Sequence, residues 1–429
     1  MKRIVTRSGR PLRGELYLPG DKSISHRALI FNGMASGEAK VEGLLRAKDV
    51  EATADCLRAL GVGIREDGDS VIVTGCGGRL TPPSEDLYCG NSGTTMRLMA
   101  GVLASQPFEA VLDGDKHLRE RPMGRIMKPL SEMGASFQGR EGGEVAPLLI
   151  RGGGLTAGEY RSPVASAQVK SALILATLGA GGGTLRFSEP HRSRDHTERM
   201  LAAMQIDLAW EDDVLVVPSA QVAQATDVCV PADISSAAFF LVAATITPGS
   251  DLVLRGVGVN PSRTGILDAL DSMGADIAVI NAREVSGEPI ADLHVRASEL
   301  SGTELSGGMI PRMIDEIPVL AVAASFARGV TKVSDAAELR VKESDRIATT
   351  VTGLKQMGVD AQESPDGLVV RGGAVTGGRV HAAGDHRIAM SFAVAGCAAT
   401  GETVVEDAEN VATSFPEFAT CLEEAMNGS

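Results

Sequence analysis

The stretch of sequence that decides the fold is residues 313–358, MIDEIPVLAVAASFARGVTKVSDAAELRVKESDRIATTVTGLKQMG. A carboxylate pair near its start is followed by the apolar run 317–326, which is typical of a buried helix. The β-branched segment 330–333 predicts a short strand. A dense ionic cluster at 342–346 then begins a second helical pattern, which ends at a glycine. Two helices and a strand thus form one repeat.

Copies of this repeat fill the chain. The ends of the second helices read LRALGVGI from Leu57, LSEMGASF from Leu130, LAAMQIDL from Leu201, LDSMGADI from Leu270 and LKQMGVDA from Leu354. Successive starts lie 73, 71, 69 and 84 residues apart, and a sixth, shorter copy covers residues 386–426. Self-similarity at a nearly fixed period predicts a repeat architecture.

Short strands and apolar helices recur within the repeats. An alternating strand follows most copies, as in VIVTG at 71–75 and LVVRG at 368–372. The first helices, such as 167–178 and 236–245, are apolar nearly all round, so we expect them to be buried. The sequence therefore predicts an α/β (α+β) fold with one buried helix per repeat and sheets around it.

The length of 429 residues predicts two domains, because single cores stop growing near about 250–300 residues. Three repeats per domain place the boundary before the fourth copy, near residues 231–233. The sixth copy lacks its closing strands, and residues 1–19 belong to no copy. We therefore expect residues 1–19 and 234–429 to form one domain, residues 20–233 to form the other, and the active site to lie in the cleft between them.

Composition excludes several functional classes. A net charge of −14 and 3% aromatic residues argue against nucleic-acid binding. The N-terminus has no apolar targeting core, and no apolar run reaches the roughly 18 residues of a membrane span. The six cysteines show neither CxxC pairs nor metal-ligand spacing. We expect reduced thiols in a cytoplasmic protein that binds neither membrane nor nucleic acid.

Polar clusters recur where the buried helices begin. They read GDKSISHR at 20–27, GNSGTTMR at 90–97, SAQVK at 166–170 and DHR at 385–387, and Asp315 stands at this point of the fifth copy. Each resembles a cap before an apolar helix, and helix N-termini attract anions because their N–H groups are unpaired. Taken singly, such a residue is more often only a cap, a turn or a solvated charge. Their recurrence at equivalent positions favours a binding site.

The starts of the second helices add further cations. One cleft would then hold seven cationic side chains: Lys22, Arg27, Arg121, Arg194, Lys342, Arg346 and Arg387. Such a set suits substrates that carry several phosphates and carboxylates, which arginine binds through its planar fork and lysine as a point charge.

Eight motifs along the chain occur together: GDKSISHRALI, GNSGTTMRLM, ERPMGRIMKPL, SAQVKSALILA, SRDHTERML, LRVKESDR, GDHRIAMSF and ATSFPEF. With this set the chain resembles the 3-phosphoshikimate 1-carboxyvinyltransferase family (5-enolpyruvylshikimate-3-phosphate, or EPSP, synthases). The resemblance implies two domains of three βαβαββ repeats each, an inside-out α/β barrel. It also implies transfer of the enolpyruvyl group of phosphoenolpyruvate to the 5-hydroxyl of shikimate 3-phosphate, with release of phosphate by addition and elimination. No metal or organic cofactor is implied.

The resemblance also implies roles for particular residues. Shikimate 3-phosphate would be contacted by Lys22, Ser23, Arg27, Ser166, Ala167, Gln168, Arg194, Asp315 and Lys342. Phosphoenolpyruvate would be contacted by Lys22, Gly93, Arg121, Gln168, Arg346 and Arg387, and Asn91 is a further substrate-binding candidate. Addition and elimination need proton transfer at both reactants. We expect Asp315 to be the base for the hydroxyl, Glu343 the proton donor to C3 of phosphoenolpyruvate, and Lys22 an assisting acid or electrostatic stabiliser.

Two departures bear on the inhibitor glyphosate, which occupies the phosphoenolpyruvate site in this family. Thr413 stands in ATSFP, where many members have lysine. ATSFP and SAQVKSA are shared with the glyphosate-tolerant branch, so we expect the chain to be closer to that branch. That branch often has alanine where Gly93 stands, which leaves the degree of tolerance open.

Two alternatives come from other classes. The sister transferase acting on UDP-N-acetylglucosamine has the same fold, but its usual cysteine is absent from residues 113–121 and its Lys-Asn start is replaced by Lys22-Ser23. A non-catalytic repeat scaffold or ring around nucleic acid is disfavoured by the acidic net charge and by the ionic starts of the apolar helices. We expect a monomeric transferase of aromatic amino acid biosynthesis.

Overall fold

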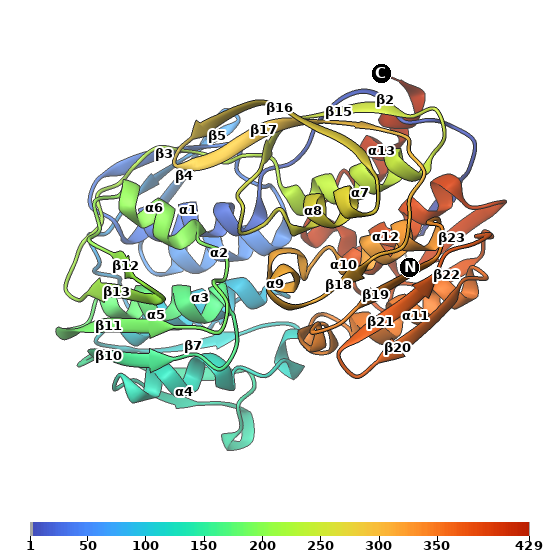
Figure 1. Cartoon of the computed structure of the whole chain (residues 1–429). Helices are drawn as coiled ribbons and strands as arrows, with labels where there is room; N and C mark the ends of the chain where they lie inside the picture. The colour runs from blue at the N-terminus through green and yellow to red at the C-terminus, as the bar shows by residue number, and fades with distance from the viewer. Residues whose placement is uncertain (1–2, 429) are drawn as a thin grey trace. The chain divides into compact units, whose positions relative to one another are not determined.

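The structure, a computed structural model, describes residues 3–428, along which helices and short sheets alternate (Figure 1). The chain divides into two compact units. Within the described residues, unit 1 comprises those up to Pro19, Pro231–Val285 and those from Pro289 onward. Unit 2 comprises Gly20–Val230 and the short segment Ser286–Glu288.

The strands of unit 2 form sheets of one repeated design. They are β3 (Glu38–Glu42), β4 (Gly63–Asp67), β5 (Ser70–Thr74), β6 (Leu87–Tyr88), β7 (Glu109–Asp113), β8 (Ser136–Gln138), β9 (Leu148–Arg151), β10 (Thr156–Arg161), β11 (Gly182–Ser188), β12 (Ala209–Glu211), β13 (Val214–Pro218) and β14 (Val228–Cys229). Across Gly20–Val230 the strand orders are β14-β3-β5-β4, β6-β7-β9-β8 and β10-β11-β13-β12. In each sheet the first pair is parallel and the other two are antiparallel.

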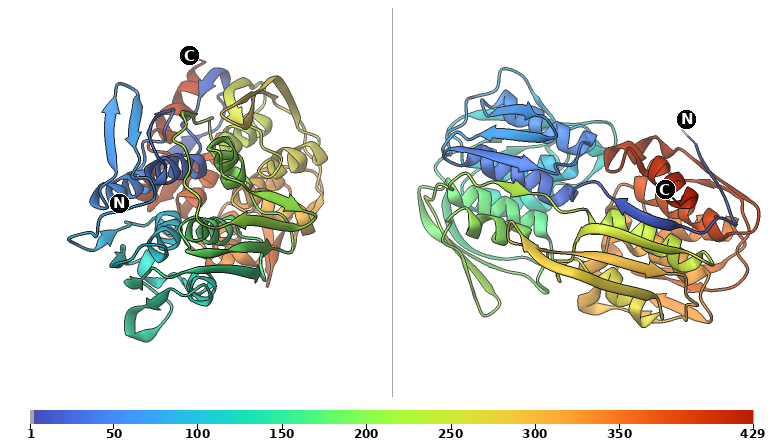
Figure 2. Two further views of the ribbon diagram at one scale, coloured as in Figure 1. Left: turned by 90° about the vertical axis from the view of Figure 1, so that its left-hand side faces the viewer. Right: turned by 90° about the horizontal axis from the view of Figure 1, so that it is seen from above.

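Unit 1 repeats this design with the strands β1 (Ile4–Arg7), β2 (Arg13–Tyr17), β15 (Asp251–Gly258), β16 (Asp276–Val285), β17 (Glu288–Arg296), β18 (Glu304–Leu305), β19 (Val330–Val333), β20 (Asp360–Ser364), β21 (Gly367–Arg371), β22 (Arg379–His381) and β23 (Glu402–Glu406). Its described sheets have the orders β2-β15-β17-β16, β18-β19-β21-β20 and β22-β23-β1. The last is completed by the N-terminal strand, since β1 pairs antiparallel with β23 and places Ile4 opposite Val405 (Figure 2).

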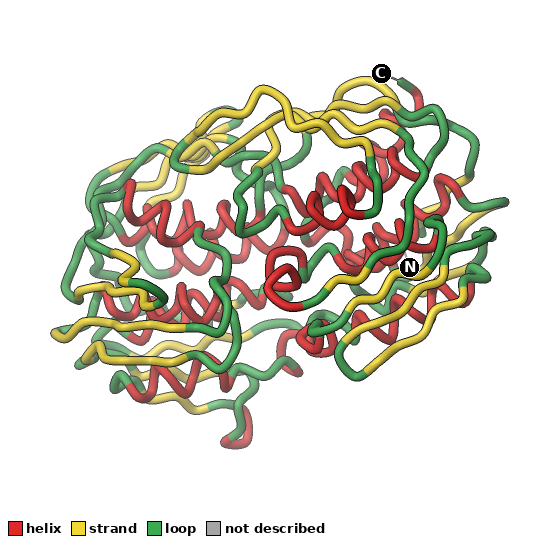
Figure 3. Tube along the Cα trace, in the orientation of Figure 1, coloured by secondary structure: helices red, strands yellow, loops and turns green. Residues whose placement is uncertain are grey.

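A set of buried helices forms the interior of each unit. They are α1 (Lys22–Met34), α3 (Gly93–Ala104) and α5 (Ala167–Leu178) in unit 2, and α7 (Ile234–Ile246), α10 (Ile317–Ser325) and α12 (His386–Ala398) in unit 1. In unit 1 these helices pack against one another, and α3 packs against α5 in unit 2. Figure 3 shows the strands of each unit outside its buried helices. Every residue of α7 is buried, as its apolar sequence predicts.

The second helices lie nearer the surface and are amphipathic. They are α2 (Lys48–Ala59), α4 (Gly124–Glu132), α6 (His196–Ala203), α8 (Gly265–Ser272), α11 (Arg346–Gln356) and, near the C-terminus, α13 (Phe418–Asn427). Short helical turns complete the fold: η1 (Leu118–Glu120), η2 (Arg140–Gly142), η3 (Gly307–Met309), α9 (Ile310–Met313), η4 (Ala337–Val341) and η5 (Ala408–Thr413). None of the helices in the described part of the chain has both the length and the apolar character to cross a membrane.

The repeated sequence after the second helices has a backbone cause. The glycines that end these helices have positive φ values, as at Gly61 (90°) and Gly358 (80°). Glycine adopts this left-handed conformation without steric cost. In the third repeat Gln205 takes the same position with a φ of 65°. The left-handed turn is therefore retained even in the repeat where another residue replaces the glycine.

The elements predicted from the opening stretch are confirmed. The predicted strand 330–333 is β19, and the predicted helix 317–326 is α10, which ends one residue earlier at Ser325. The chain has a mixed α/β fold whose small mixed sheets agree with the repeats. The core of each unit is a separate cluster of buried aliphatic and aromatic side chains.

Candidate active site

Side-chain caps begin nearly all of the buried helices. In each, an Asp or Ser oxygen accepts a hydrogen bond from a backbone N–H of the first turn, which satisfies one of the unpaired donors. The caps are Asp21, Ser92, Ser166, Asp233 and Asp385. α10 is the exception: Glu316 precedes it without a side-chain cap bond. The expectation that Asp315 is a cap-like group is therefore wrong, because its carboxylate lies against Arg346 and Arg387 and does not cap α10.

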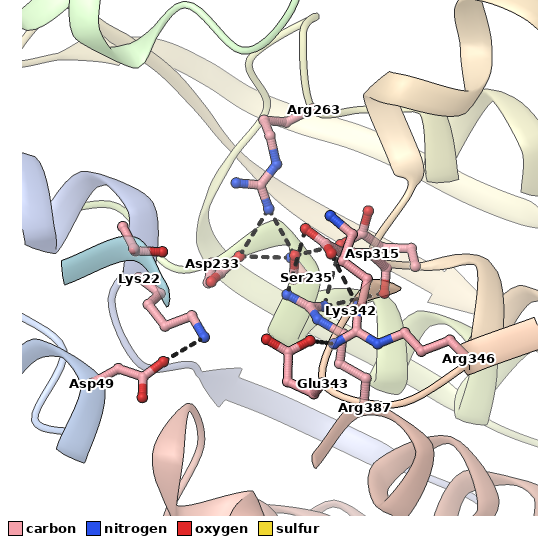
Figure 4. A network of polar contacts seen from close by, with 12 residues as sticks. Lys22, Asp49, Asp233, Ser235, Arg263, Asp315, Lys342, Glu343, Arg346 and Arg387 are labelled. Atoms are coloured by element: carbon pink, nitrogen blue, oxygen red, sulfur yellow. Dashed lines mark hydrogen bonds and ion pairs between the residues drawn. The ribbon is translucent and has the colours of Figure 1, made fainter. Parts of the chain in front are cut away.

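In unit 2, Lys22 begins α1 and is paired with Asp49 of α2. The Nζ of Lys22 lies 3.1 Å from Oδ2 of Asp49, and both side chains are largely buried (Figure 4). The pair places the ammonium group at the N-terminal end of α1, where the helix dipole favours an anion.

Arg27 lies one turn further along α1 and is held by neutral oxygen atoms. Its Nε donates to Oγ1 of Thr197 and its Nη2 to Oγ of Ser171, both at 2.8 Å. Its Nη1 donates to the carbonyl oxygen of Ser23 at 3.0 Å. Ser171 in turn donates to the carbonyl oxygen of Ala167 at 2.6 Å. The buried guanidinium thus joins the starts of α1, α5 and α6.

A second cluster of unit 2 surrounds Gly93. Arg97 Nη1 donates to Oε1 of Gln168 at 2.8 Å, and Nε2 of Gln168 donates to Oγ1 of Thr94 at 3.0 Å. A methyl group on Gly93 would lie 2.8 Å from Nη1 of Arg97 and 3.2 Å from Nη1 of Arg121. The space beside this glycine is therefore filled by two guanidinium groups.

Asn91 lies at the edge of the same cluster, where its Oδ1 accepts a hydrogen bond from Arg121. Arg121 follows η1, and Asn91 precedes the Ser92 cap of α3. The structure thus brings together four predicted site residues of this region: Asn91, Gly93, Arg121 and Gln168.

Glu189 joins the start of α5 to the loop before α6. Its Oε2 accepts from the backbone N–H of Ser166 at 3.2 Å, and its Oε1 accepts from the N–H of Ser193 at 2.7 Å. Lys170 lies behind it, with Nζ 2.7 Å from Oε1 of Glu198. Arg194 directly follows Ser193, so the loop that carries it is fixed relative to Ser166.

In unit 1, three carboxylates surround Arg346, the first residue of α11. Its side chain is 1% exposed, with Nε 2.8 Å from Oδ2 of Asp385 and Nη1 3.1 Å from Oδ1 of Asp315. Nη2 donates to Glu343 (Figure 4). Burial opposes the charge, but the three carboxylates raise the pKa of Arg346. The guanidinium is therefore a permanent cation that brings Asp315 and Glu343 together.

Arg387, at the start of α12, lies on the other side of Asp315. Its Nη1 donates to the carbonyl oxygen of Asp315 at 3.3 Å and lies 3.5 Å from Oε1 of Glu316. Its Nη2 lies 4.0 Å from Oδ2 of Asp315. The two arginines thus approach the two oxygens of one carboxylate.

Lys342 and Thr413 have local partners. Nζ of Lys342 lies 3.0 Å from Oε1 of Glu338, which is one turn earlier in the chain. Oγ1 of Thr413 donates to the carbonyl oxygen of Asn410 at 2.6 Å, within η5. Asn410 in turn donates to the carbonyl oxygen of Gly384, beside the cap of α12.

The structure adds residues to these clusters that the sequence analysis did not assign. Arg97 could have been assigned from the sequence, because it ends the GNSGTTMR cluster one helical turn after Gly93. Glu316 likewise belongs to the carboxylate pair before α10. The sequence around Asp49 does not indicate a site residue, because its partner Lys22 lies 27 residues away. No group of three or more His, Cys, Asp or Glu residues in the described chain is arranged to hold a metal ion.

The chain is similar to known proteins over nearly its whole length. Residues 6–422 match the family model of EPSP synthase (3-phosphoshikimate 1-carboxyvinyltransferase). The chain is 53% identical to the 3-phosphoshikimate 1-carboxyvinyltransferase of Citrifermentans bemidjiense over 99% of both chains. It is 54% identical to that of Desulforudis audaxviator over 96% of this chain and 97% of the relative.

A solved structure gives the same result for the fold. The EPSP synthase of Acinetobacter baumannii superimposes with a TM-score of 0.88 at 43% sequence identity, over 99% of this chain and 98% of that one. Family model, relatives and solved structure thus agree over nearly the whole length. The chain belongs to the EPSP synthase (3-phosphoshikimate 1-carboxyvinyltransferase) family.

Proposed function

We propose that the clusters at the helix starts carry out the reaction of this family and that Asp315, Glu343 and Lys22 are its catalytic residues. The chain has EPSP synthase activity and acts in the shikimate pathway, which supplies the aromatic amino acids. The reaction joins shikimate 3-phosphate and phosphoenolpyruvate and releases phosphate. The observation that carries the assignment is the meeting of Asp315 and Glu343 around Arg346.

The chemistry requires two opposite proton transfers. In the addition, the 5-hydroxyl oxygen attacks C2 of phosphoenolpyruvate and loses its proton, while C3 gains a proton and becomes a methyl group. In the elimination, C3 returns a proton and the C2–O bond to phosphate breaks, which restores the double bond. One group must accept the hydroxyl proton and another must serve C3.

The surroundings of Asp315 suit a base that accepts the proton of the 5-hydroxyl group. Its carboxylate is oriented from both sides, by Arg346 at 3.1 Å and by Arg387 at 4.0 Å. We assign Glu343 as the acid that serves C3. Its side chain is partly exposed, and it forms an ion pair with Arg346, three residues later in the sequence. Lys22, paired with Asp49, supplies positive charge for the phosphate that leaves.

The remaining candidates fit the binding of the two anionic substrates. We assign to shikimate 3-phosphate the residues Lys22, Ser23, Arg27, Ser166, Ala167, Gln168, Arg194, Asp315 and Lys342. We assign to phosphoenolpyruvate the residues Lys22, Gly93, Arg121, Gln168, Arg346 and Arg387, with Asn91 as the partner that orients Arg121. Arginine binds phosphate and carboxylate groups through its planar fork and lysine binds them as a point charge, which supports both assignments.

The finer architecture belongs to the proposal as well. Units 1 and 2 would be the two domains of three βαβαββ repeats, each an inside-out arrangement with helices within and sheets around them. The shared strand order of the described sheets and the packing of α7, α10 and α12 support it. The convergence of both helix sets on one cleft, the monomeric state and the cytoplasmic location stay predictions.

Glyphosate tolerance is proposed to be partial. ATSFP and SAQVKSA support a place near the tolerant branch, while Gly93 departs from it. The guanidinium groups of Arg97 and Arg121 lie where a methyl on Gly93 would point. An alanine there would displace Arg121, which we assign to the binding of phosphoenolpyruvate, together with its neighbour Arg97.

Phosphate release tests the activity directly. The purified chain should release phosphate from phosphoenolpyruvate only when shikimate 3-phosphate is present, in equal amount to the EPSP formed. UDP-N-acetylglucosamine in place of shikimate 3-phosphate would support release only if the chain were the sister transferase. A non-catalytic scaffold would release phosphate with neither acceptor.

A further inference from the structure

Glu316 is a buried carboxylate next to the proposed base. The residue is 1% exposed and precedes the apolar helix α10. Its Oε1 accepts a hydrogen bond from Oγ of Ser235 and lies 3.5 Å from Nη1 of Arg387. Burial of a carboxylate is unfavourable unless ion pairs and hydrogen bonds offset it. The Glu316 carboxylate is therefore held in place by Ser235 and Arg387.

The fourth repeat holds Glu316 from behind. Nη2 of the buried Arg263 donates to Oγ of Ser235 at 2.7 Å and lies 3.4 Å from Oδ1 of Asp233, the cap of α7 (Figure 4). A guanidinium group only donates and a carboxylate only accepts. The single hydroxyl proton of Ser235 must then point at Glu316. The order of donors, from Arg263 through Ser235 to Glu316, is thereby set.

The chain of contacts ends on Arg387. Its Nη1 lies between the Glu316 carboxylate and the carbonyl oxygen of Asp315, at 3.5 and 3.3 Å. A guanidinium group is planar, so fixing this nitrogen from two directions sets the plane in which its other N–H groups point. The cap of Asp385 on the backbone N–H of Arg387, at 2.9 Å, fixes the other end of the residue.

We infer that Glu316, held by Ser235 and Arg263, is a positioning residue that orients Arg387 toward phosphoenolpyruvate. The inference rests on the proposed contact between Arg387 and that substrate. It also gives the fourth repeat a part in the reaction, since the sequence analysis assigned no substrate contact to its helix start. Glu316 acts through Arg387 and not on the reacting atoms.

Steady-state kinetics of Glu316→Gln tests the inference, because the amide keeps the size of the side chain and removes its charge. The Michaelis constant for phosphoenolpyruvate should rise roughly tenfold, while that for shikimate 3-phosphate stays within about twofold. Ser235→Ala removes the donor and should raise the same constant about threefold. Glu402→Gln, at a surface pair with Arg7, is the matched control and should change neither constant.

Combination with Arg387→Lys separates positioning from a general loss of structure. Arg387→Lys alone should raise the constant for phosphoenolpyruvate. Adding Glu316→Gln to it should then change this constant by less than about twofold, because the residue that Glu316 orients is already altered. A purely structural role would make the two effects multiply, and that result would overturn the inference.

The other outcomes are also decisive. If Arg387→Lys weakens phosphoenolpyruvate binding but Glu316→Gln and Ser235→Ala do not, Glu316 does not position Arg387, while the proposed function stands. If Arg387→Lys has no effect on that constant, the assignment of Arg387 fails and the inference fails with it. Should Glu316→Gln not fold, Ser235→Ala answers the same question, because it leaves the carboxylate in place.

Discussion

A buried arginine of unit 2 and one of unit 1 are held by different kinds of oxygen atom. In unit 2, neutral oxygens of Thr197, Ser171 and Ser23 hold Arg27. In unit 1, carboxylates surround Arg346. Hydroxyl and carbonyl groups orient a guanidinium without neutralising it, whereas carboxylates cancel its charge and are themselves oriented by it. We propose that the first kind of setting suits the binding of an anionic substrate and that the second suits the placing of carboxylates for proton transfer.

The largest expected effect on the reaction comes from replacing Asp315, the proposed base of unit 1. Asp315→Asn can still accept the hydrogen bond from Arg346 but cannot take a proton, so turnover should fall by roughly 10²–10⁴-fold. Binding of shikimate 3-phosphate, measured by calorimetry, should persist. A loss confined to substrate affinity would instead show that Asp315 only positions the substrate.

The second carboxylate of unit 1 should act on the other reactant. Glu343→Gln should lower turnover by about 10²-fold or more and abolish the exchange of hydrogen at C3 of phosphoenolpyruvate with solvent. Exchange is followed by NMR in deuterated water, with the wild type as reference. Normal exchange in the variant would remove Glu343 from the role of acid at C3.

Arg27 of unit 2 should affect binding and not the chemical step. Arg27→Gln removes a charged donor worth about 1.5–3 kcal/mol, which corresponds to a rise of roughly 10–100-fold in the Michaelis constant for shikimate 3-phosphate. The turnover number should change little. A large fall in turnover with an unchanged Michaelis constant would contradict the assignment of Arg27 to substrate binding.

A buried histidine of unit 2 predicts a pH effect on stability. Burial, with the charges of Lys22 and Arg27, lowers the pKa of His26 well below its ordinary value of 6.5, and Nδ1 lies 2.7 Å from Oγ1 of Thr53. Below about pH 6.5 the unfolded chain binds a proton that the folded chain does not. The free energy of unfolding should therefore decrease as the pH falls, by up to about 1.4 kcal/mol per unit.

Denaturant titrations of wild type and His26→Gln between pH 7 and 5 measure this slope. The variant should lack the part due to His26. Glu198, whose pKa is raised by burial, adds a slope of the opposite sign in both proteins, so the comparison removes it. Equal slopes in the two proteins would mean that His26 is not kept neutral by folding.

The smallest expected change is at Gly93. Gly93→Ala places a methyl against Arg97 and Arg121, whose flexible ends can shift by a few tenths of an ångström. Glyphosate is longer than phosphoenolpyruvate, so the shift should penalise the inhibitor more. The inhibition constant should rise by a several-fold larger factor than the Michaelis constant for phosphoenolpyruvate, measured at fixed shikimate 3-phosphate. Equal factors would direct attention to Thr94 and Leu98.

The sequence by itself determined the repeats and their elements. The strand β19 and the buried helices α5 and α7 follow from local periodicity, because a helix or strand is decided by neighbours a few residues away. The polar clusters before apolar helices were visible for the same reason. The left-handed turn after each second helix could be predicted wherever a glycine stood.

Only the tertiary structure decided which of these groups meet. Arg346 donates hydrogen bonds to carboxylates that are 3, 31 and 39 residues away in the sequence. Glu316 accepts a hydrogen bond from Ser235, which is 81 residues earlier. Such contacts depend on how buried helices pack against one another, and no periodic pattern records that packing. Burial then determines what each contact does: the same arginine side chain is a solvated charge at the surface and a fixed template for carboxylates in the interior.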